Sequence, residues 1–191
     1  MFKVIRQNNR GFTLVETLVA ISIFTMSVLT LLIILSQGIS SVNYAKNKII
    51  AEYLAQEGIE YMNNIRDTNV ITASTASVGW NDFKAQINSC FTLDGCYLND
   101  NDLFDGGASL TVKNLSYTPC TGNCPALLYD LGNSSNGKYN YSYGLTTTFV
   151  RKITTTQVSP DEIKVTSSVS WSQGSGTKTV TFSTNLFNWI E

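Results

Sequence analysis

An apolar run of 24 residues, from Phe12 to Leu35, contains a single charged side chain, Glu16. As a helix rising about 1.5 Å per residue it is about 36 Å long, enough to cross a hydrocarbon core of about 30 Å. Residues 1–11 hold three basic side chains and no acidic one. Because basic residues stay on the cytoplasmic side, the sequence predicts a single-pass helix in the cytoplasmic (inner) membrane, with its N-terminus inside and the C-terminal part exported.

Three interpretations of residues 1–35 are open. A secretory signal peptide has an apolar region of about 7–15 residues before a small-residue cleavage site, whereas this run is longer and Ser36-Gln37-Gly38 is a poor site. A plain membrane anchor fits the length but leaves Glu16 unexplained, because a charged side chain inside a span costs about 2.5–3.5 kcal/mol. The third interpretation is cleavage before the apolar run, which keeps the helix and removes its basic leader.

The segment Arg10-Gly11-Phe12-Thr13-Leu14-Val15-Glu16 resembles the processing motif of type IV prepilins and pseudopilins. The resemblance implies that a membrane-embedded prepilin peptidase cuts between Gly11 and Phe12 and methylates the new N-terminus at Phe12. It further implies that Glu16 pairs with the free amine of a neighbouring subunit. The implied partners are other pilins or pseudopilins, reached through the N-terminal helix, a membrane assembly platform, and the lipid bilayer before assembly.

The residues of this motif have a physical rationale of their own. Phe12 and Glu16 are four positions apart and therefore share one face of a helix. Cleavage after Gly11 would create an ammonium group at Phe12, and no Lys or Arg follows Glu16 until Lys46. The alternative is that Glu16 only favours the positive end of the helix dipole, an effect of about 0.3–1 kcal/mol that is too small to offset burial in lipid. The sequence therefore favours the amine as the partner of Glu16.

Helical spacing of apolar residues continues beyond the span, over residues 36–66. The apolar positions are Val42, Ala45, Ile49, Ile50, Tyr53, Leu54, Met62 and Ile65. They predict an amphipathic stalk that extends the helix to a length of about 80 Å. Gly38 lies near the end of the membrane run and is either a bend or a close-packing point. The stretch Ala51–Asp67 also resembles the stalk of minor pilins and pseudopilins.

The pattern changes to period two in the C-terminal part of the head, residues 144–190. Alternating apolar and polar residues predict strands over Thr146–Thr156, about 163–171 and about 179–186, joined by turns at Ser159-Pro160-Asp161 and Ser172–Thr177. The predicted fold is α+β and pilin-like, a long N-terminal transmembrane helix packed on a C-terminal antiparallel sheet. The chain thus divides into a leader (1–11), an assembly helix (12–35), a stalk (36–66) and an exported head (67–191). The aromatic residues expected in the core are Trp171, Phe182 and Trp189.

All four cysteines lie in the intervening region, 68–143, which is rich in Gly, Asn and Asp and reads as irregular loops. They are Cys90, Cys96, Cys120 and Cys124. Two disulfides are favoured over a zinc site, because export leads to an oxidising compartment and the Cys spacing is not a usual zinc spacing. Four cysteines allow three connectivities. Local pairing, Cys90 with Cys96 and Cys120 with Cys124, is preferred.

Neither a cofactor nor catalytic chemistry is expected. The chain has no His, which excludes Ser-His and Cys-His nucleophile systems, and its formal net charge of −1 argues against a nucleic-acid partner. The Asp-rich segment Asn99–Gly107 could bind Ca²⁺ but lacks the EF-hand spacing, so a solvated turn is the simpler interpretation.

Three functions remain open at this point. The first is a structural subunit, a minor pilin or pseudopilin of a type IV pilus or related filament. The second is a pseudopilin of a type II secretion or DNA-uptake system. The third is a membrane-anchored binding domain that does not assemble. The filament would lie outside the cell or in the periplasm.

Overall fold

A computed structural model describes residues 11, 13–98, 117–132, 137–174 and 176–188. Contacts divide the chain into two compact units, Met1–Ala45 and Lys46–Glu191, which are considered separately. The first helix, α1 (Leu14–Thr72), contributes to both units. The segment Asn99–Gly107, with its candidate calcium site, lies outside the described residues, as does Trp189.

The helix α1 ends six residues later than the predicted stalk, at Thr72. Asn69 explains the extension, because it is buried and its side-chain amide donates to the Ile65 carbonyl oxygen at 3.0 Å and to Gln86 Oε1 at 2.8 Å. The last turns of α1 are therefore held by contacts with the segment that follows. The helix has no break at Gly38, where an added Cβ would meet nothing within 4 Å.

A second helix, α2 (Ala76–Gln86), and a 3-10 turn, η1 (Asn88–Phe91), follow α1. The sequence interpretation of 68–143 as irregular loops is wrong here. Thr75 caps α2 by accepting from the Val78 backbone N–H at 3.4 Å, and Trp80 and Phe83 are buried one turn apart. Gly79 allows a close crossing, because a Cβ there would lie 2.6 Å from the Val70 Cα of α1.

The described residues form one antiparallel sheet of seven strands. Its strands are β1 (Cys96–Leu98), β2 (Tyr117–Pro119), β3 (Ala126–Tyr129), β4 (Tyr139–Asn140), β5 (Leu145–Ser159), β6 (Glu162–Gln173) and β7 (Gly176–Phe187). The order β2-β1-β5-β3-β4 describes one part of it, and β6 pairs with both β5 and β7. The three long strands form the predicted meander, which confirms the α+β, pilin-like fold class.

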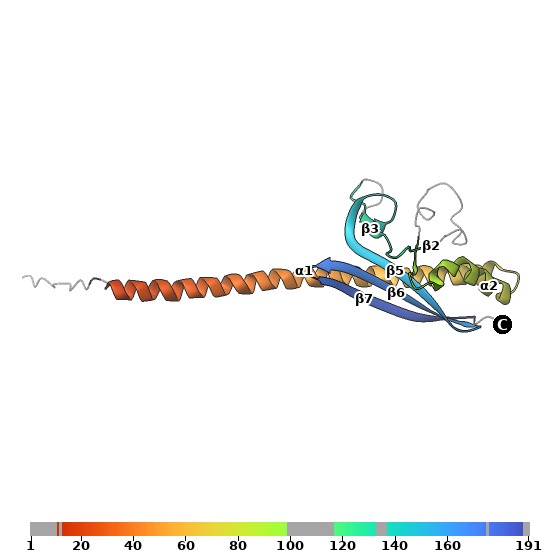
Figure 1. Ribbon diagram of the computed structural model, residues 1–191, viewed down its shortest axis with the longest axis horizontal. Coiled ribbons are helices and arrows are strands. Elements are labelled where there is room, and N and C mark those ends of the chain that lie inside the picture. Colours follow the sequence, from red (N-terminus) through yellow and green to blue (C-terminus); the bar gives the residue numbers. More distant parts are fainter. Residues whose placement is uncertain (1–10, 12, 99–116, 133–136, 175, 189–191) are drawn as a thin grey trace, which may run out of the picture. The chain divides into compact units, whose positions relative to one another are not determined.

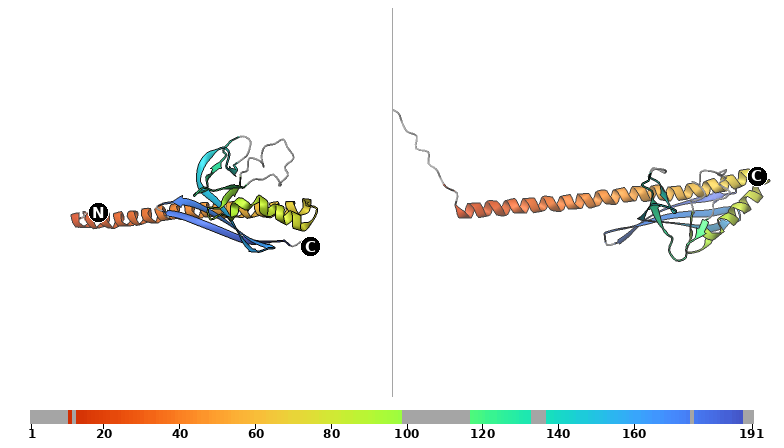
Figure 2. Two further views of the ribbon diagram at one scale, coloured as in Figure 1. Left: turned by 45° about the vertical axis from the view of Figure 1, so that its right-hand side comes forward. Right: turned by 90° about the horizontal axis from the view of Figure 1, so that it is seen from above.

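The core of the second unit lies between the C-terminal part of α1 and the inner face of the β5–β6–β7 sheet (Figures 1 and 2). Small residues of α1 permit the close approach: Ala51 and Ala55 are fully buried, and a Cβ on Gly58 would lie 2.6 Å from Ser167 Oγ on β6. Trp171 is buried as predicted, whereas Phe182 is half-buried on the outermost strand.

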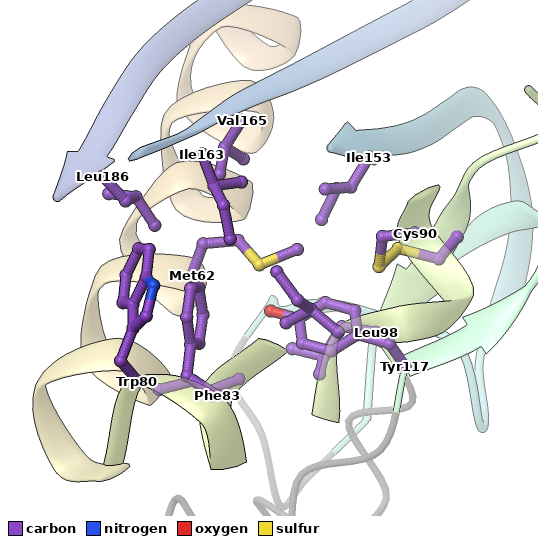
Figure 3. Packing of buried hydrophobic residues seen from close by; sticks show 13 residues of the cluster. Met62, Trp80, Phe83, Cys90, Leu98, Tyr117, Ile153, Ile163, Val165 and Leu186 are labelled. Carbon is purple, nitrogen blue, oxygen red and sulfur yellow. A yellow bond between two sulfur atoms is a disulfide. The ribbon is translucent and has the colours of Figure 1, made fainter. Parts of the chain in front are cut away.

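Two hydrophobic clusters fill this layer. The larger one joins α1, α2, η1 and the sheet, and Figure 3 shows Met62 at its centre among Trp80, Phe83, Leu98, Ile163 and Leu186. The smaller one is built from Ala51, Leu54, Ala55, Leu127, Phe149, Val169 and Trp171. The predicted stalk stripe is correct for Leu54, Met62 and Ile65. Others of its members, Val42, Ile49 and Tyr53, are exposed.

Candidate functional site

The N-terminal end of α1 is the region to which the sequence assigns function. Gly11 is exposed and non-helical, and the helix begins at Leu14. Thr13 caps it: its Oγ1 accepts from the Glu16 backbone N–H at 3.2 Å, and its carbonyl oxygen accepts from the Thr17 N–H at 3.2 Å. The Thr-x-x-Glu spacing is a capping-box signal that marks this start in the sequence. The peptide bond after Gly11 thus lies outside the helix. Phe12 is not among the described residues.

The first part of α1 is exposed throughout in the residues that the structure describes. Every described side chain from Gly11 to Lys46 is exposed. The exposed fraction is 69% for Phe24, 61% for Leu31 and 61% for Leu35. By length and composition alone, α1 is the one helix of the described residues that could cross a membrane. A helix that is apolar on all sides is stable only when lipid or other protein surrounds it.

Polar side chains in this part of α1 are largely satisfied by the helix itself. Five hydroxyls donate to backbone carbonyl oxygens three or four residues earlier, at 2.8–2.9 Å; they belong to Thr17, Ser22, Thr25, Ser27 and Thr30. Glu16 differs, because its carboxylate has no ion pair with any residue that the structure describes. The Glu16 carboxylate is therefore the group in this segment that could pair with a cation from another molecule.

A partly buried ion pair lies between α1 and the sheet in the second unit. Arg151 of β5 is 3% exposed, and its Nη1 donates to Glu57 Oε2 at 2.6 Å and to the Leu54 carbonyl oxygen at 3.2 Å. The guanidinium carbon also lies 5.7 Å from the ring centre of Tyr61 and 5.8 Å from that of Tyr141, within the range of cation–π attraction. The sequence analysis missed this pair, although strand alternation places Arg151 on the inner face between two buried residues, Phe149 and Ile153.

Protonation of the buried groups follows from these contacts. Burial acts to lower the pKa of Arg151, but Tyr141 and Glu57 raise it by more, so its pKa lies above the ordinary value and the side chain stays charged. Burial raises the pKa of the Tyr117 hydroxyl well above its usual range, with Arg151 opposing the shift. Tyr117 therefore stays neutral wherever the protein is folded at ordinary pH.

The four cysteines form two disulfides, with the local pairing that the sequence favoured. Cys90 of η1 is joined to Cys96 of β1, with a Cα–Cα distance of 4.7 Å, and both are fully buried in the larger cluster. Cys120 is joined to Cys124, with a Cα–Cα distance of 4.8 Å. The Cys120 backbone N–H donates to the Gly95 carbonyl oxygen at 2.9 Å, which brings the two disulfide loops together. Disulfide sulfurs are not thiolates, so the zinc alternative does not apply.

A groove of about 470 Å³ lies between α1 and β4 in the second unit. Its lining residues are Ile50, Tyr53, Leu54, Glu57, Lys138 and Tyr139. Its acidic side chain, Glu57, is already paired with Arg151. Among the described residues, no group of three or more His, Cys, Asp or Glu could hold a metal ion. The described part of the head thus consists of a packed core, two disulfides and a sheet with one face toward solvent.

Comparison with known families bears on the N-terminal segment. Residues 6–32 match a family model described as the prokaryotic N-terminal methylation motif, which is characteristic of type IV prepilin-like proteins. The resemblance carried by the Gly11–Glu16 segment is thereby confirmed. No curated protein and no solved structure is similar enough to the chain to be matched to it.

Proposed function

We propose that this chain is a structural subunit, a minor pilin or pseudopilin, of a type IV pilus or a related secretion or DNA-uptake filament. It is cut after Gly11, methylated on Phe12, and assembled with other pilins or pseudopilins through its apolar helix. Its role is mechanical, and it needs neither a cofactor nor a catalytic group. Before assembly the helix spans the inner membrane with its N-terminus in the cytoplasm.

The observation that carries this proposal is the exposure of every described side chain from Gly11 to Lys46 in a segment that bears the methylation motif. Exposed apolar surface is driven out of water at roughly 25 cal/mol per Å². Lipid can cover it before assembly, and copies of the same kind of helix can cover it afterwards. A plain anchor would need only the lipid and would gain nothing from a processing site.

The local structure around Gly11 suits proteolysis. Gly11 is exposed and precedes the capped start of the helix by three positions, so a peptidase reaches the bond without unwinding α1. An added Cβ on Gly11 would meet nothing within 4 Å in the folded chain, so the glycine is not needed for packing. Its role is therefore assigned to close approach by the peptidase, which a side chain would obstruct.

Glu16 supplies the assembly contact in this proposal. Because the hydroxyls of this segment are satisfied internally and Glu16 has no ion pair among the described residues, the carboxylate seeks a cation. Cleavage provides one at Phe12 of a neighbouring subunit. In a low-dielectric bundle such a pair sets the axial register of one helix against the next.

The N-terminal mass of the mature protein tests the processing step. In cells that contain the prepilin peptidase we expect a chain that lacks residues 1–11 and carries one added methyl group on Phe12; in cells without the peptidase we expect the full precursor. A native chain that still begins at Met1 in the presence of the peptidase refutes the proposal.

The assembly step is tested with Glu16→Gln, which keeps the shape of the side chain and removes its charge. We expect this variant to be processed normally and to fall about tenfold or more in the sheared filament fraction, equivalent to at least about 1.4 kcal/mol. Thr17→Ala is the matched control, since the Thr17 hydroxyl donates to the Leu14 carbonyl oxygen in its own turn. Equal incorporation of Glu16→Gln and wild type into filaments would contradict the assembly contact assigned to Glu16, whereas the absence of both chains from the filament fraction would support the anchored binding domain.

A further inference from the structure

The strand β7 (Gly176–Phe187) forms a long edge of the sheet. It pairs with β6 without interruption from Glu162↔Phe187 to Gln173↔Gly176, and β6 is its one partner among the strands that the structure describes. The backbone N–H and C=O groups on the other side of β7 are thus open for pairing over a strand of 12 residues.

Natural proteins protect such an edge with charged side chains, prolines, bulges or short strands. Here the register with β6 has no shift, the strand has no proline, and its single charged residue is Lys178, near the turn. On the inner face, Val180 and Phe182 are only half-buried, and among the described strands none lies beyond β7 to cover them. The described residues of β7 thus carry little of the usual protection against further strand pairing.

We propose that β7 receives an extended segment of a different protein chain as an additional strand of this sheet. This inference rests on the proposed function, because it uses the common orientation of subunits in a filament. The incoming segment would place apolar side chains beside Val180 and Phe182 and small hydroxyl side chains on the opposite face.

The direction of β7 excludes pairing with the β7 of a second copy in the same filament. The strand β7 runs in the same direction as α1. In α1 the chain passes from the smaller cluster at Ala51 to the larger cluster at Ile65, and in β7 it passes from the smaller cluster at Val180 to the larger one at Leu186. An antiparallel β7–β7 pair would therefore hold two α1 segments in opposite directions. For a parallel β7–β7 pair, one copy would have to be turned over about the strand direction so that the two free edges meet. The apolar face of one strand would then lie beside the hydroxyl face of the other.

The other described edges of the sheet cannot fill the place either. β2 has three residues and β4 has two. Each is antiparallel to a strand that is itself antiparallel to β5, so both run in the same direction as β7. A like-oriented copy could thus offer β7 only a parallel contact of two or three residues.

The outer face shows what chemistry the incoming strand should have. Hydroxyl pairs already link β6 to β7 there: Thr166 and Ser183 lie 3.0 Å apart, and Ser168 and Thr181 lie 3.1 Å apart. A third strand with Ser or Thr at alternate positions would continue these rows, and apolar residues at the other positions would cover Val180 and Phe182. Main-chain hydrogen bonds supply affinity in this mode, and alternate side chains supply specificity.

Photo-crosslinking in cells that assemble the filament tests the proposal. A photoreactive amino acid is placed at Thr179, Thr181 or Ser183 of the full chain, and at Ser170 on β6 as the control. We expect the β7 positions to crosslink to one other protein, with linked residues that step by two along one extended segment. The Ser170 position should give markedly less of this product.

Blunting the edge provides a second measurement. Thr179 and Ser170 are direct neighbours in the β6–β7 register, so Thr179→Lys and Ser170→Lys place the same charge on an edge strand and on a covered strand. We expect Thr179→Lys to reduce the yield of the crosslink from Ser183 at least about tenfold, which corresponds to a loss of about 1.4 kcal/mol or more in binding free energy. We expect Ser170→Lys to leave this yield within about twofold of the wild-type value. Both variants should keep the thermal midpoint of wild type.

The outcomes separate the two proposals. Crosslinks to a second copy of this chain, or none from a subunit present in filaments, overturn the β7 inference and leave the filament role intact. Equal loss with both Lys variants also overturns it. An unprocessed chain that never enters filaments overturns the proposed function and, with it, the argument from common orientation.

Discussion

The partly buried ion pair between Glu57 and Arg151 gives the sharpest stability prediction. Glu57→Gln keeps the size of the side chain but leaves a guanidinium that is 3% exposed without its carboxylate. The Leu54 carbonyl oxygen, at 3.2 Å, would remain as an acceptor. Breaking a fully buried pair costs about 3–5 kcal/mol. Because the Glu57 side chain is 38% exposed, solvent screens the pair, and we expect a smaller loss of about 2–3 kcal/mol in the free energy of unfolding.

Thermal unfolding of the full chain in detergent measures this loss. For a protein of this size, 1 kcal/mol corresponds to about 2–4 °C, so the midpoint should fall by about 5–10 °C. Tryptophan fluorescence follows the unfolding, because Trp80 and Trp171 are buried in the core of the second unit. The matched control is Glu52→Gln on the same helix, which removes an exposed pair with Lys48 at 3.8 Å and should change the stability by less than about 0.5 kcal/mol.

A second variant distinguishes electrostatics from packing. Adding Arg151→Met to Glu57→Gln removes the unpaired charge and should restore part of the lost stability. If Glu57→Gln is as stable as Glu52→Gln, or if the double variant is less stable than the sum of the single changes, the ion pair does not act as argued.

Three further changes probe other parts of the second unit. Gly79→Ala should lower the unfolding free energy by about 1–3 kcal/mol despite the better helix propensity of Ala, because the new Cβ would meet the Val70 backbone at 2.6 Å; chemical denaturation measures it. Tyr117→Phe should raise stability by up to about 1 kcal/mol, since the buried hydroxyl has no hydrogen-bond partner among the described residues. The raised pKa of Tyr117 means that the unfolded chain loses its proton first, so wild-type stability should fall above about pH 10, and the Phe variant should fall less in a pH series of melts. Cys90→Ala with Cys96→Ala should cost at least about 2 kcal/mol from loop entropy, and an unchanged melting temperature would contradict a role for this disulfide in the core.

Much of the fold was predictable because the relevant signals are local and long. The strands β5, β6 and β7 alternate over 12 to 15 residues, and period two is hard to mistake at that length. The short helix α2 was missed because Ser77, Gly79 and Asn81 are residue types that are common in loops. Its signal was present in the spacing of Trp80, Phe83 and Ile87, all of which are buried.

Long-range features could not be read in the same way. Glu57 and Arg151 are 94 positions apart, and no local pattern pairs them. Likewise, helical spacing cannot tell which face of a stripe the sheet will cover, so Ile49 and Tyr53 are exposed although Leu54 is buried. The N-terminal site was readable because its motif, Gly11 through Glu16, is contiguous.

One helix therefore serves two different environments, and this division has a testable consequence. Residues 14–45 of α1 are all exposed in the part of the chain that the structure describes, whereas the part of α1 that contains Ala51, Gly58 and Met62 belongs to the core of the second unit. Substitutions in the first part should change assembly without changing the unfolding of the head. Mild substitutions in the second part should change the unfolding of the head without changing assembly. Glu16→Gln and Glu57→Gln make the same chemical change in the two parts. If the Glu16 variant lowered the melting temperature of the head as much as the Glu57 variant, the two parts of the helix would be energetically coupled and the separation argued here would not hold.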